Sequence, residues 1–227
     1  MLLNFIFDFA GTLADLKPLS EEMLYNFLKE NYDLDIDIQK IQRAYECVDR
    51  NIFYSSVNVR SYEDKKDFYK FYNDILLSNL ALSHIVDNSK NQIFEYFISI
   101  KRHWVLKKDV KDTFKRLKDK NKNISIVSNF DSKLKDILQN LQIDEFIDNL
   151  HISQDEGFEK PDVRFYEIFL KKYNINPKDS LYIGDSYELD FQPALKAGLE
   201  PLLLDERGRF EKNSYIIENI SDVLRYV

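Results

Sequence analysis

The sequence predicts an α/β fold in which a doubly wound parallel sheet is interrupted by an inserted bundle of four helices. Outside the insert, short apolar runs alternate with helical patterns, which is typical of parallel sheets joined by right-handed crossovers. Within the insert, helical patterns follow one another with no strand between them, as in a small bundle. With 227 residues, 44% of them apolar, the chain can form a core and a second unit.

The first predicted element is a buried strand at residues 5–7, followed by Asp8 and by a turn at Gly11 and Thr12. A run of aromatic and β-branched residues bounded by glycine favours a strand. Glycine allows a sharp turn and the close approach of an anion, to which the threonine hydroxyl can donate a hydrogen bond. The strand therefore presents a carboxylate at the edge where open α/β sheets bind ligands. Taken alone, the pattern also fits a strand that ends in a polar turn.

Four amphipathic helices are predicted in the insert, the third with Ser61 as its N-cap. They cover residues 19–31, 35–54 and 62–80, with a fourth that begins at Ser83 or Asp87 and runs toward Trp104. Many of the 14 Tyr and 17 Phe residues fall between positions 25 and 100, so this unit is predicted to have an aromatic interior. We assign the core to residues 1–15 and 105–227, the inserted unit to residues 16–104, and the hinges to residues 13–18 and 101–108.

Strands and helices alternate again after the insert. Strands are predicted at residues 124–127, 149–152, 180–183 and 201–204. Helices are predicted at residues 109–120, 132–141, 162–173 and 190–197, followed by a loop and a short closing element at 221–227. Successive units of this kind are expected to form one parallel sheet.

Composition excludes several classes of protein. The net charge is −7, and the most basic stretch, residues 115–122, fits the solvated end of a helix rather than a nucleic-acid site. Cys47 is the single cysteine, which excludes an intrachain disulfide and fits a reducing compartment. No apolar run has the length of a membrane span, and the N-terminus lacks the basic region of a signal peptide. We therefore expect a cytoplasmic protein that binds neither nucleic acid nor membranes.

Polar side chains stand at the carboxyl ends of three predicted strands: Asp8, Ser128 and Asp185. Adjacent parallel strands lie about 4.8 Å apart, so these groups can converge on one pocket. Lys160, at the start of a predicted helix, can point the same way. Two carboxylates, a hydroxyl and an ammonium suit a phosphoryl group bound with a divalent cation, because Mg²⁺ prefers hard oxygen ligands.

The segments DFAGT, VSNF, EKPD and GDSYELD occur in this order and resemble the four motifs of the haloacid dehalogenase-like hydrolase superfamily. The insert directly after the first motif resembles the helical cap of the C1 subfamily. The resemblance covers about residues 2–205. It implies a Rossmann-like core with a cap domain, and a hydrolase that acts on small phosphorylated metabolites, as a monomer or a homodimer.

The resemblance also implies roles for the residues that match these motifs. Asp8 is expected to be the nucleophile that forms an aspartyl-phosphate. The phosphate is expected to be held by Thr12, Ser128, Asn129 and Lys160. For Lys160, a solvated charge beside a helix start is the alternative.

Mg²⁺ is the cofactor that the resemblance implies. Its expected ligands are Asp8, Asp185 and the backbone carbonyl of Ala10. Asp190 is expected to support this metal shell or to orient Lys160. The alternative for Asp190 is an N-cap of the helix that follows.

One position departs from the superfamily pattern. Phosphatases of this superfamily usually carry a second aspartate two residues after the nucleophile, which protonates the leaving alcohol and then activates water. Here that residue is Ala10, and a general acid–base group of this kind contributes about 10²–10⁴-fold in rate. The chain is therefore predicted to be a phosphatase of weak activity, or one in which another acid takes over: Asp15, Glu46, Asp49 or His84.

Ala10 leaves other interpretations open. Phosphonoacetaldehyde hydrolase also has alanine there and forms a Schiff base with a cap lysine, for which the candidates here are Lys40, Lys65, Lys66 and Lys70. A 2-haloacid dehalogenase needs no leaving-group acid, and Arg43 is a candidate for binding its halide, although the retained Asp185 favours Mg²⁺. The chain could also be an inactive phosphate-binding relative, or Ala10 an engineered substitution. Substrate choice is expected to depend on residues of the insert that share one helix: Arg43, Tyr45, Asp49, Arg50 and Tyr54.

Overall fold

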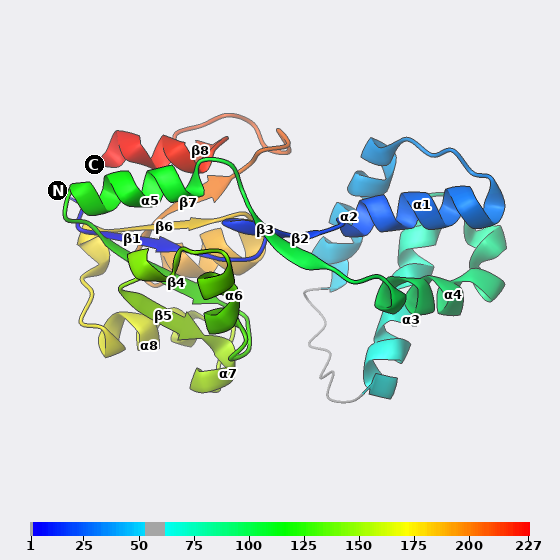
Figure 1. Cartoon of the computed structure of the whole chain (residues 1–227), viewed down its shortest axis with the longest axis horizontal. Coiled ribbons are helices and arrows are strands. Elements are labelled where there is room, and N and C mark those ends of the chain that lie inside the picture. The colour runs from blue at the N-terminus through cyan, green and yellow to red at the C-terminus, as the bar shows by residue number, and fades with distance from the viewer. Residues whose placement is uncertain (1, 53–61) are drawn as a thin grey trace. The chain divides into compact units, whose positions relative to one another are not determined.

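The computed structural model describes residues 2–52 and 62–227, and the chain divides into two compact units (Figure 1). The first unit contains Met1–Leu16 and Trp104–Val227, and the second contains Lys17–His103. The boundaries expected from the sequence differ from these by one residue each. The predicted N-cap Ser61 and the predicted helix end at Tyr54 lie outside the described residues.

The first unit is built on a six-stranded sheet whose recorded pairings are all parallel. Its strands are β1 (Asn4–Phe7), β4 (Asn123–Ser128), β5 (Asn149–Ile152), β6 (Ser180–Gly184), β7 (Glu200–Leu204) and β8 (Ile216–Ile217). Across the sheet their order is β5–β4–β1–β6–β7–β8, so the strand order reverses between β1 and β6. Open α/β sheets bind ligands at such a reversal, outside the carboxyl ends of the strands.

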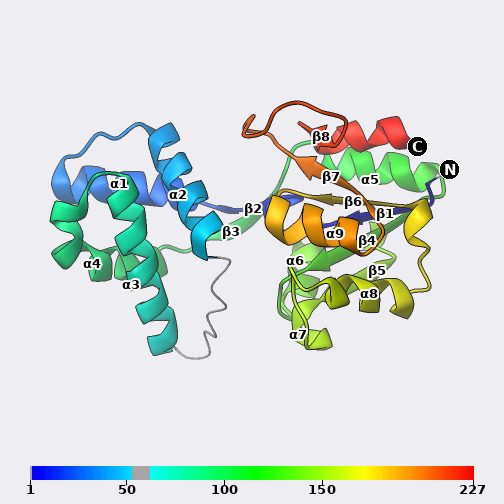
Figure 2. The same cartoon turned by 180° about the vertical axis from the view of Figure 1, so that it is seen from behind.

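Helices cover both faces of this sheet, as Figures 1 and 2 show. Phe5 and Phe7 of β1 pack on one side, with α5 (Val110–Asp119), α6 (Leu134–Asn140) and the closing 3₁₀ helix η5 (Ile220–Tyr226). Ile6 packs on the other side, with α8 (Val163–Lys172) and α9 (Gln192–Lys196). Successive strand residues point to opposite faces, and these three side chains are fully buried. The predicted doubly wound parallel sheet is confirmed.

Short helical segments complete the first unit. They are η2 (Asp144–Phe146), α7 (Ser153–Glu156), η3 (Pro177–Asp179) and the π-helical turn η4 (Tyr187–Phe191). The sequence predicted one helix over residues 190–197, whereas the structure has η4 followed by α9. Lys122, predicted to be solvated at a helix end, is 2% exposed because its ammonium donates to the carbonyl of Leu2.

The second unit is helical, with α1 (Ser20–Tyr32), α2 (Ile38–Ile52), α3 (Tyr62–Asn79), η1 (Ser83–Ile85) and α4 (Val86–Ser99). These helices share an apolar core that includes Leu24, Ile41, Leu76 and Ile93. Aromatic rings pack against it, among them Phe27 with Tyr96, whose ring centroids lie 5.4 Å apart. The four predicted helices and their aromatic interior are confirmed for the described residues.

Two strands that the sequence did not reveal join the units: β2 (Ala14–Lys17) and β3 (His103–Leu106) pair as a two-stranded sheet. Both fall in the predicted hinges, and they pair with each other rather than with the six-stranded sheet. Trp104 of β3 packs its ring against Phe9 at 4.9 Å and Phe130 at 5.7 Å. Among the described residues, no helix has the length and apolarity needed to cross a membrane.

Candidate active site

Three of the polar groups predicted to converge do lie together at the carboxyl edge of the sheet. Asp8 directly follows β1, Ser128 is the last residue of β4, and Asp185 directly follows β6. The amide of Asp8 donates to the carbonyl of Ile183 at 2.9 Å, which continues the pairing of β1 with β6 by one residue. The hydroxyl of Ser128 donates to Asp8 Oδ1 at 3.3 Å. The register of three adjacent parallel strands therefore sets the position of this carboxylate.

Lys160 places a positively charged side chain in the site. Its ammonium donates to Asp8 Oδ1 at 2.6 Å and to Asp190 Oδ1 at 2.7 Å, and its side chain is 3% exposed. Burial by itself lowers the pKa of an ammonium, but Asp190 and Asp8 outweigh burial and raise the pKa of Lys160. The interpretation of Lys160 as a solvated surface charge is wrong.

Asn129 fixes the backbone of Lys160. The amide of Lys160 donates to Asn129 Oδ1 at 2.8 Å, and Asn129 Nδ2 donates back to the Lys160 carbonyl at 3.0 Å. Two reciprocal hydrogen bonds thus join the end of β4 to the turn before α8. The side chain of Lys160 is aimed at Asp8 from a backbone that cannot rotate freely.

Asp190 is held from three sides. Its Oδ1 accepts from Lys160 and from the phenol of Tyr182, the latter at 2.8 Å, and its Oδ2 accepts from the amide of Ser186 at 3.1 Å. Burial, followed by the charge of Asp190, raises the pKa of Tyr182 well above its usual value, so its phenol stays a proton donor.

The N-cap interpretation of Asp190 is wrong. Asp190 lies inside η4, and its side chain bonds back to Ser186, four residues earlier, rather than to the amides of α9. The residue before α9 is Phe191, which makes no side-chain capping bond. Its Oδ1 instead accepts a hydrogen bond from Lys160, the contact that the expected role of orienting Lys160 requires.

Asp185 stands opposite the Gly11 turn. Its Oδ1 accepts from the hydroxyl of Thr12 at 3.2 Å. Gly11 has φ +82°, and a Cβ added there would lie 2.6 Å from Asp185 Oδ2, so only glycine leaves room for this carboxylate. Burial, together with the charges of Asp190 and Asp8, raises the pKa of Asp185 to about 7.

The donor set of this edge fits a magnesium ion. One carboxylate oxygen from each of Asp8, Asp185 and Asp190 lies within 4.8 Å of the others. Three carboxylates and the ammonium of Lys160 give a formal charge of −2, which a divalent cation neutralises. Hard oxygen donors are those that Mg²⁺ prefers. Because both oxygens of Asp190 already accept hydrogen bonds, Asp8 and Asp185 are the carboxylates suited to direct ligation.

Two contributors were missed by sequence reasoning. Tyr182 lies in the middle of a buried strand, where a tyrosine gives no sign that its phenol meets a charged group. Arg209 lies in the segment after β7, where its guanidinium donates to the Asp185 carbonyl at 3.1 Å. Neither residue falls in one of the four motifs.

The position of the missing acid is occupied by a small exposed residue. Ala10 forms an isolated bridge with Ala14. Asp15, the nearest candidate replacement in the chain, has its carboxylate paired with Lys107 at 3.1 Å, and Lys107 also pairs with Glu206. Within the first unit, the carboxylate of Asp15 is thus engaged in an ion-pair cluster of its own.

The candidates of the second unit are dispersed within it. Asp49 accepts a hydrogen bond from the phenol of Tyr72 at 2.6 Å, and burial raises the pKa of Asp49. The phenol of Tyr45 donates to the Ser20 carbonyl at 3.3 Å. Arg43 is exposed and lines a surface hollow of about 480 Å³ together with Asp37, Lys40, Ala44 and Asn79. Glu46 is half-buried and His84 exposed, whereas Tyr54 and the side chain of Arg50 lie outside the described residues.

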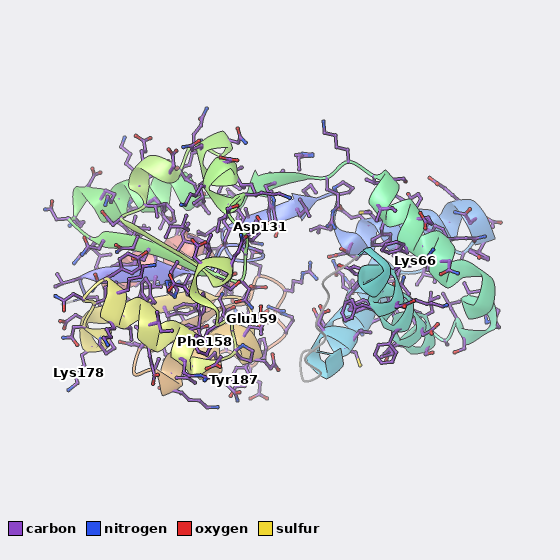
Figure 3. All side chains as sticks on the ribbon, turned by 90° about the horizontal axis from the view of Figure 1, so that it is seen from below. Lys66, Asp131, Phe158, Glu159, Lys178 and Tyr187 are labelled. Atoms are coloured by element: carbon purple, nitrogen blue, oxygen red, sulfur yellow. The ribbon has the colours of Figure 1, made fainter. Side chains whose placement is uncertain are left out.

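Of the four candidate Schiff-base lysines, three have side chains that the structure describes. Lys66, labelled in Figure 3, pairs with Glu95 at 3.8 Å. Lys40 is exposed and Lys70 half-buried, and the side chain of Lys65 lies outside the described residues.

A buried aspartate–lysine pair thus lies at the point where the strand order of a doubly wound sheet reverses, with a second carboxylate beside it. The chain belongs to the haloacid dehalogenase-like hydrolase family, whose model matches residues 5–203. This match includes all four motifs and the insert.

Similar curated proteins come from several kingdoms. Haloacid dehalogenase-like hydrolase domain-containing protein 3 of Mus musculus is 29% identical over 168 residues, which are 68% of this chain and 66% of that protein. Its Bos taurus and Homo sapiens counterparts match over 40% of their length. A glyceraldehyde 3-phosphate phosphatase of Methanothermobacter thermautotrophicus is 31% identical over 114 residues, 47% of this chain and 50% of that protein. The first three relatives are thus matched over less than two thirds of their length.

Solved structures share the whole fold. The putative HAD-hydrolase YfnB from Bacillus subtilis, bound to magnesium, aligns with a TM-score of 0.67 at 16% identity, over 100% of this chain and 99% of that one. The HAD phosphatase from Thermococcus onnurineus aligns with a TM-score of 0.58 at 17% identity, over 99% and 97% of the two chains. At such identities the likeness shows the fold alone.

Proposed function

We propose that this protein is a Mg²⁺-dependent phosphohydrolase in which Asp8 is the nucleophile. The observation that carries the proposal is the buried contact of Asp8 Oδ1 with the Lys160 ammonium and the Ser128 hydroxyl. A carboxylate flanked by a fixed cation and a hydroxyl donor can meet a phosphoryl group whose oxygens those same donors then bind. The family membership and the phosphatase among the relatives support the same reaction class.

In this reaction the Asp8 carboxylate attacks phosphorus, an aspartyl-phosphate forms and the alcohol leaves; water then hydrolyses the acyl phosphate and releases phosphate. Lys160, Ser128 and Thr12 bind the phosphoryl oxygens. Asn129 acts through Lys160, whose backbone it holds.

Asp8, Asp185 and the backbone carbonyl of Ala10 are the proposed ligands of Mg²⁺. When bound, the ion withdraws charge from the phosphoryl oxygens. Asp190 keeps Lys160 in place and lies beside the ligands. The three carboxylates repel one another without a cation, which gives the protein an electrostatic reason to bind one.

The proposed substrate is a small phosphorylated metabolite. The name of the Methanothermobacter relative makes a three-carbon sugar phosphate the first compound to test. With Ala10 in place of an acid, a leaving group that needs little protonation is favoured, and alkyl esters are expected to react slowly. The second unit, Lys17–His103, is proposed to act as the cap that selects the leaving group. A cytoplasmic location and the choice between monomer and homodimer stay predictions.

The test is hydrolysis of a phosphate-ester panel by the purified protein, with Mg²⁺ and with EDTA. We expect turnover only with Mg²⁺, loss of turnover in Asp8→Asn, and a mass increase of one phosphoryl group on Asp8 when the acyl phosphate is trapped. Asp119→Asn, an exposed carboxylate at the end of α5, is the matched control and should behave as the wild type. Turnover that persists in Asp8→Asn would rule out this nucleophile.

The same panel separates the other hydrolase chemistries. Phosphonoacetaldehyde with borohydride tests the Schiff-base interpretation, which requires a covalent adduct on a lysine of the second unit. A 2-haloacid tests the dehalogenase interpretation through halide release. A protein that binds phosphate but converts none of these compounds would be the phosphate-binding relative.

A further inference from the structure

We propose that Arg209 is a positioning residue that fixes the Asp185 segment for the divalent cation. This inference rests on the proposed function, because it concerns the metal site of that reaction. Arg209 lies outside all four motifs, between β7 and β8, and it is 24 residues away from Asp185 in the chain.

The guanidinium of Arg209 bridges two neighbouring strand ends. Its Nη2 donates to the carbonyl of Asp185, just after β6, at 3.1 Å, and to the carbonyl of Leu204, the last residue of β7, at 3.4 Å. Its Nε donates to Asp205 Oδ1 at 3.2 Å. A planar guanidinium can make these bonds at once in a fixed geometry. Arg209 thus ties the residue that carries a metal-ligand carboxylate to the adjacent strand.

Asp205 is the anchor of this bridge. Its side chain is 1% exposed, whereas that of Arg209 is 24% exposed. Besides Arg209, its Oδ2 accepts from the amide of Phe210 at 2.8 Å. Burial alone raises the pKa of Asp205, but the backbone amides and Arg209 outweigh it and lower that pKa. A buried, ionised anchor with several hydrogen bonds holds the guanidinium in one orientation.

Glu206, the residue after Asp205, attaches the segment between β7 and β8 at a second point. Glu206 pairs with Lys107, which follows β3 and also pairs with Asp15. The segment from Asp205 to Arg209 is therefore attached at both of its ends within the first unit. Such attachment keeps Arg209 in position before any ligand arrives.

The measurement is Mg²⁺ binding by calorimetric titration of the substrate-free protein, followed by turnover as a function of Mg²⁺ concentration. Residues that orient metal ligands typically contribute about 10–100-fold in affinity. We expect Arg209→Ala to weaken Mg²⁺ binding by about tenfold or more, with turnover largely recovered at saturating Mg²⁺. Arg209→Lys keeps the charge but cannot make the three bonds, so it should restore only part of the affinity.

The matched control is Arg164→Ala. Arg164 also donates to an aspartate, Asp162, and lies over a phenylalanine ring, Phe158, but the partners described for it do not include Asp185. The Mg²⁺ affinity of Arg164→Ala should equal that of the wild type. Asp205→Asn, which keeps the shape of the anchor, should weaken binding in the same direction as Arg209→Lys. Unfolding midpoints of all variants show whether each protein is folded.

The outcomes separate this inference from the proposed function. If folded Arg209→Lys and Asp205→Asn bind Mg²⁺ as tightly as the wild type, the role proposed for Arg209 is overturned, whereas the proposed function is not affected. An equal loss in Arg164→Ala would overturn it as well, because the effect would then be unspecific. A wild-type protein that does not bind Mg²⁺ would overturn the metal-dependent function and the inference with it.

Discussion

Gly184 leaves the space that the Asp190 side chain fills: a Cβ at residue 184 would lie 2.3 Å from Asp190 Cγ and 2.4 Å from its Cβ. Gly184 ends β6, and Asp190 lies in the π-helical turn that follows. The absence of a side chain therefore lets this turn fold back onto the strand. As a result, Asp190 reaches Lys160 and Tyr182.

Gly184→Ala is expected to displace Asp190 and thereby to release Lys160. Overpacking a buried position typically costs roughly 1–3 kcal/mol, so we expect a lower free energy of unfolding and a loss of turnover. Urea unfolding and phosphatase assays measure both. Gly157→Ala is the control: Gly157 has φ +71°, so alanine strains the backbone there, but nothing lies within 4 Å of an added Cβ, so some stability should be lost while turnover is kept. A fully active Gly184→Ala would mean that the turn can move without consequence.

Lys160→Met is expected to abolish turnover and to lower stability. The substitution leaves Asp8 and Asp190 facing each other without their shared cation, and breaking a buried ion pair costs about 3–5 kcal/mol. Lys172→Met serves as the control: Lys172 pairs with Glu156 at the surface, and its side chain is 46% exposed. Equal unfolding curves for the two variants would contradict the expected contribution of the buried Lys160 ammonium to stability. The matched readout is the free energy of unfolding without Mg²⁺.

The stability of the metal-free protein should fall with rising pH because of Asp185. Its pKa is about 7 in the folded protein against 3.8 for an ordinary aspartate, so the folded state holds this proton more tightly than the unfolded state. The resulting stabilisation is complete below the unfolded value and is lost as pH rises through the folded one. Unfolding in EDTA should therefore show a steeper loss over this range for the wild type than for Asp185→Asn. Parallel pH profiles of the two proteins would refute the assignment.

Ala10→Asp is expected to raise turnover of alkyl phosphates. It restores a carboxyl group two residues after Asp8, and a general acid–base group contributes about 10²–10⁴-fold. The rate constant should rise most for substrates with poor leaving groups and little for aryl phosphates. Ala10→Asn, similar in size but unable to donate a proton in this way, is the matched control. A flat response across both kinds of substrate would show that leaving-group protonation does not limit this enzyme.

Much of the fold was predictable because its signals are local. Three short apolar runs predict buried strands, and the structure has a strand at each of them: before Asp8, up to Ser128 and before Asp185. The helices of the second unit were predictable from the helical spacing of their apolar residues. By contrast, β2, β3 and β8 were not predicted: β2 and β3 pair although the whole inserted unit separates them in the chain, and β8 has only two residues.

The candidate site was predictable in part. Motif order indicated which residues meet, but not what each side chain contacts. That Asp190 binds Lys160 and Tyr182 rather than capping a helix depends on the π-helical turn, which the sequence predicted as an ordinary helix. Arg209 had no signal at all, since its partners become neighbours only when β6 and β7 pair.

By itself, therefore, the sequence determined the alternation of strands and helices, the inserted helical unit and the set of groups at the sheet edge, because period, turn residues and motif order are properties of neighbouring positions. Only the tertiary structure decided the contacts within the site. Lys160 and Asp8 are separated by 152 positions, and a hydrogen bond between such residues depends on the register of strands and on the burial of both groups, neither of which is encoded in any one stretch of chain.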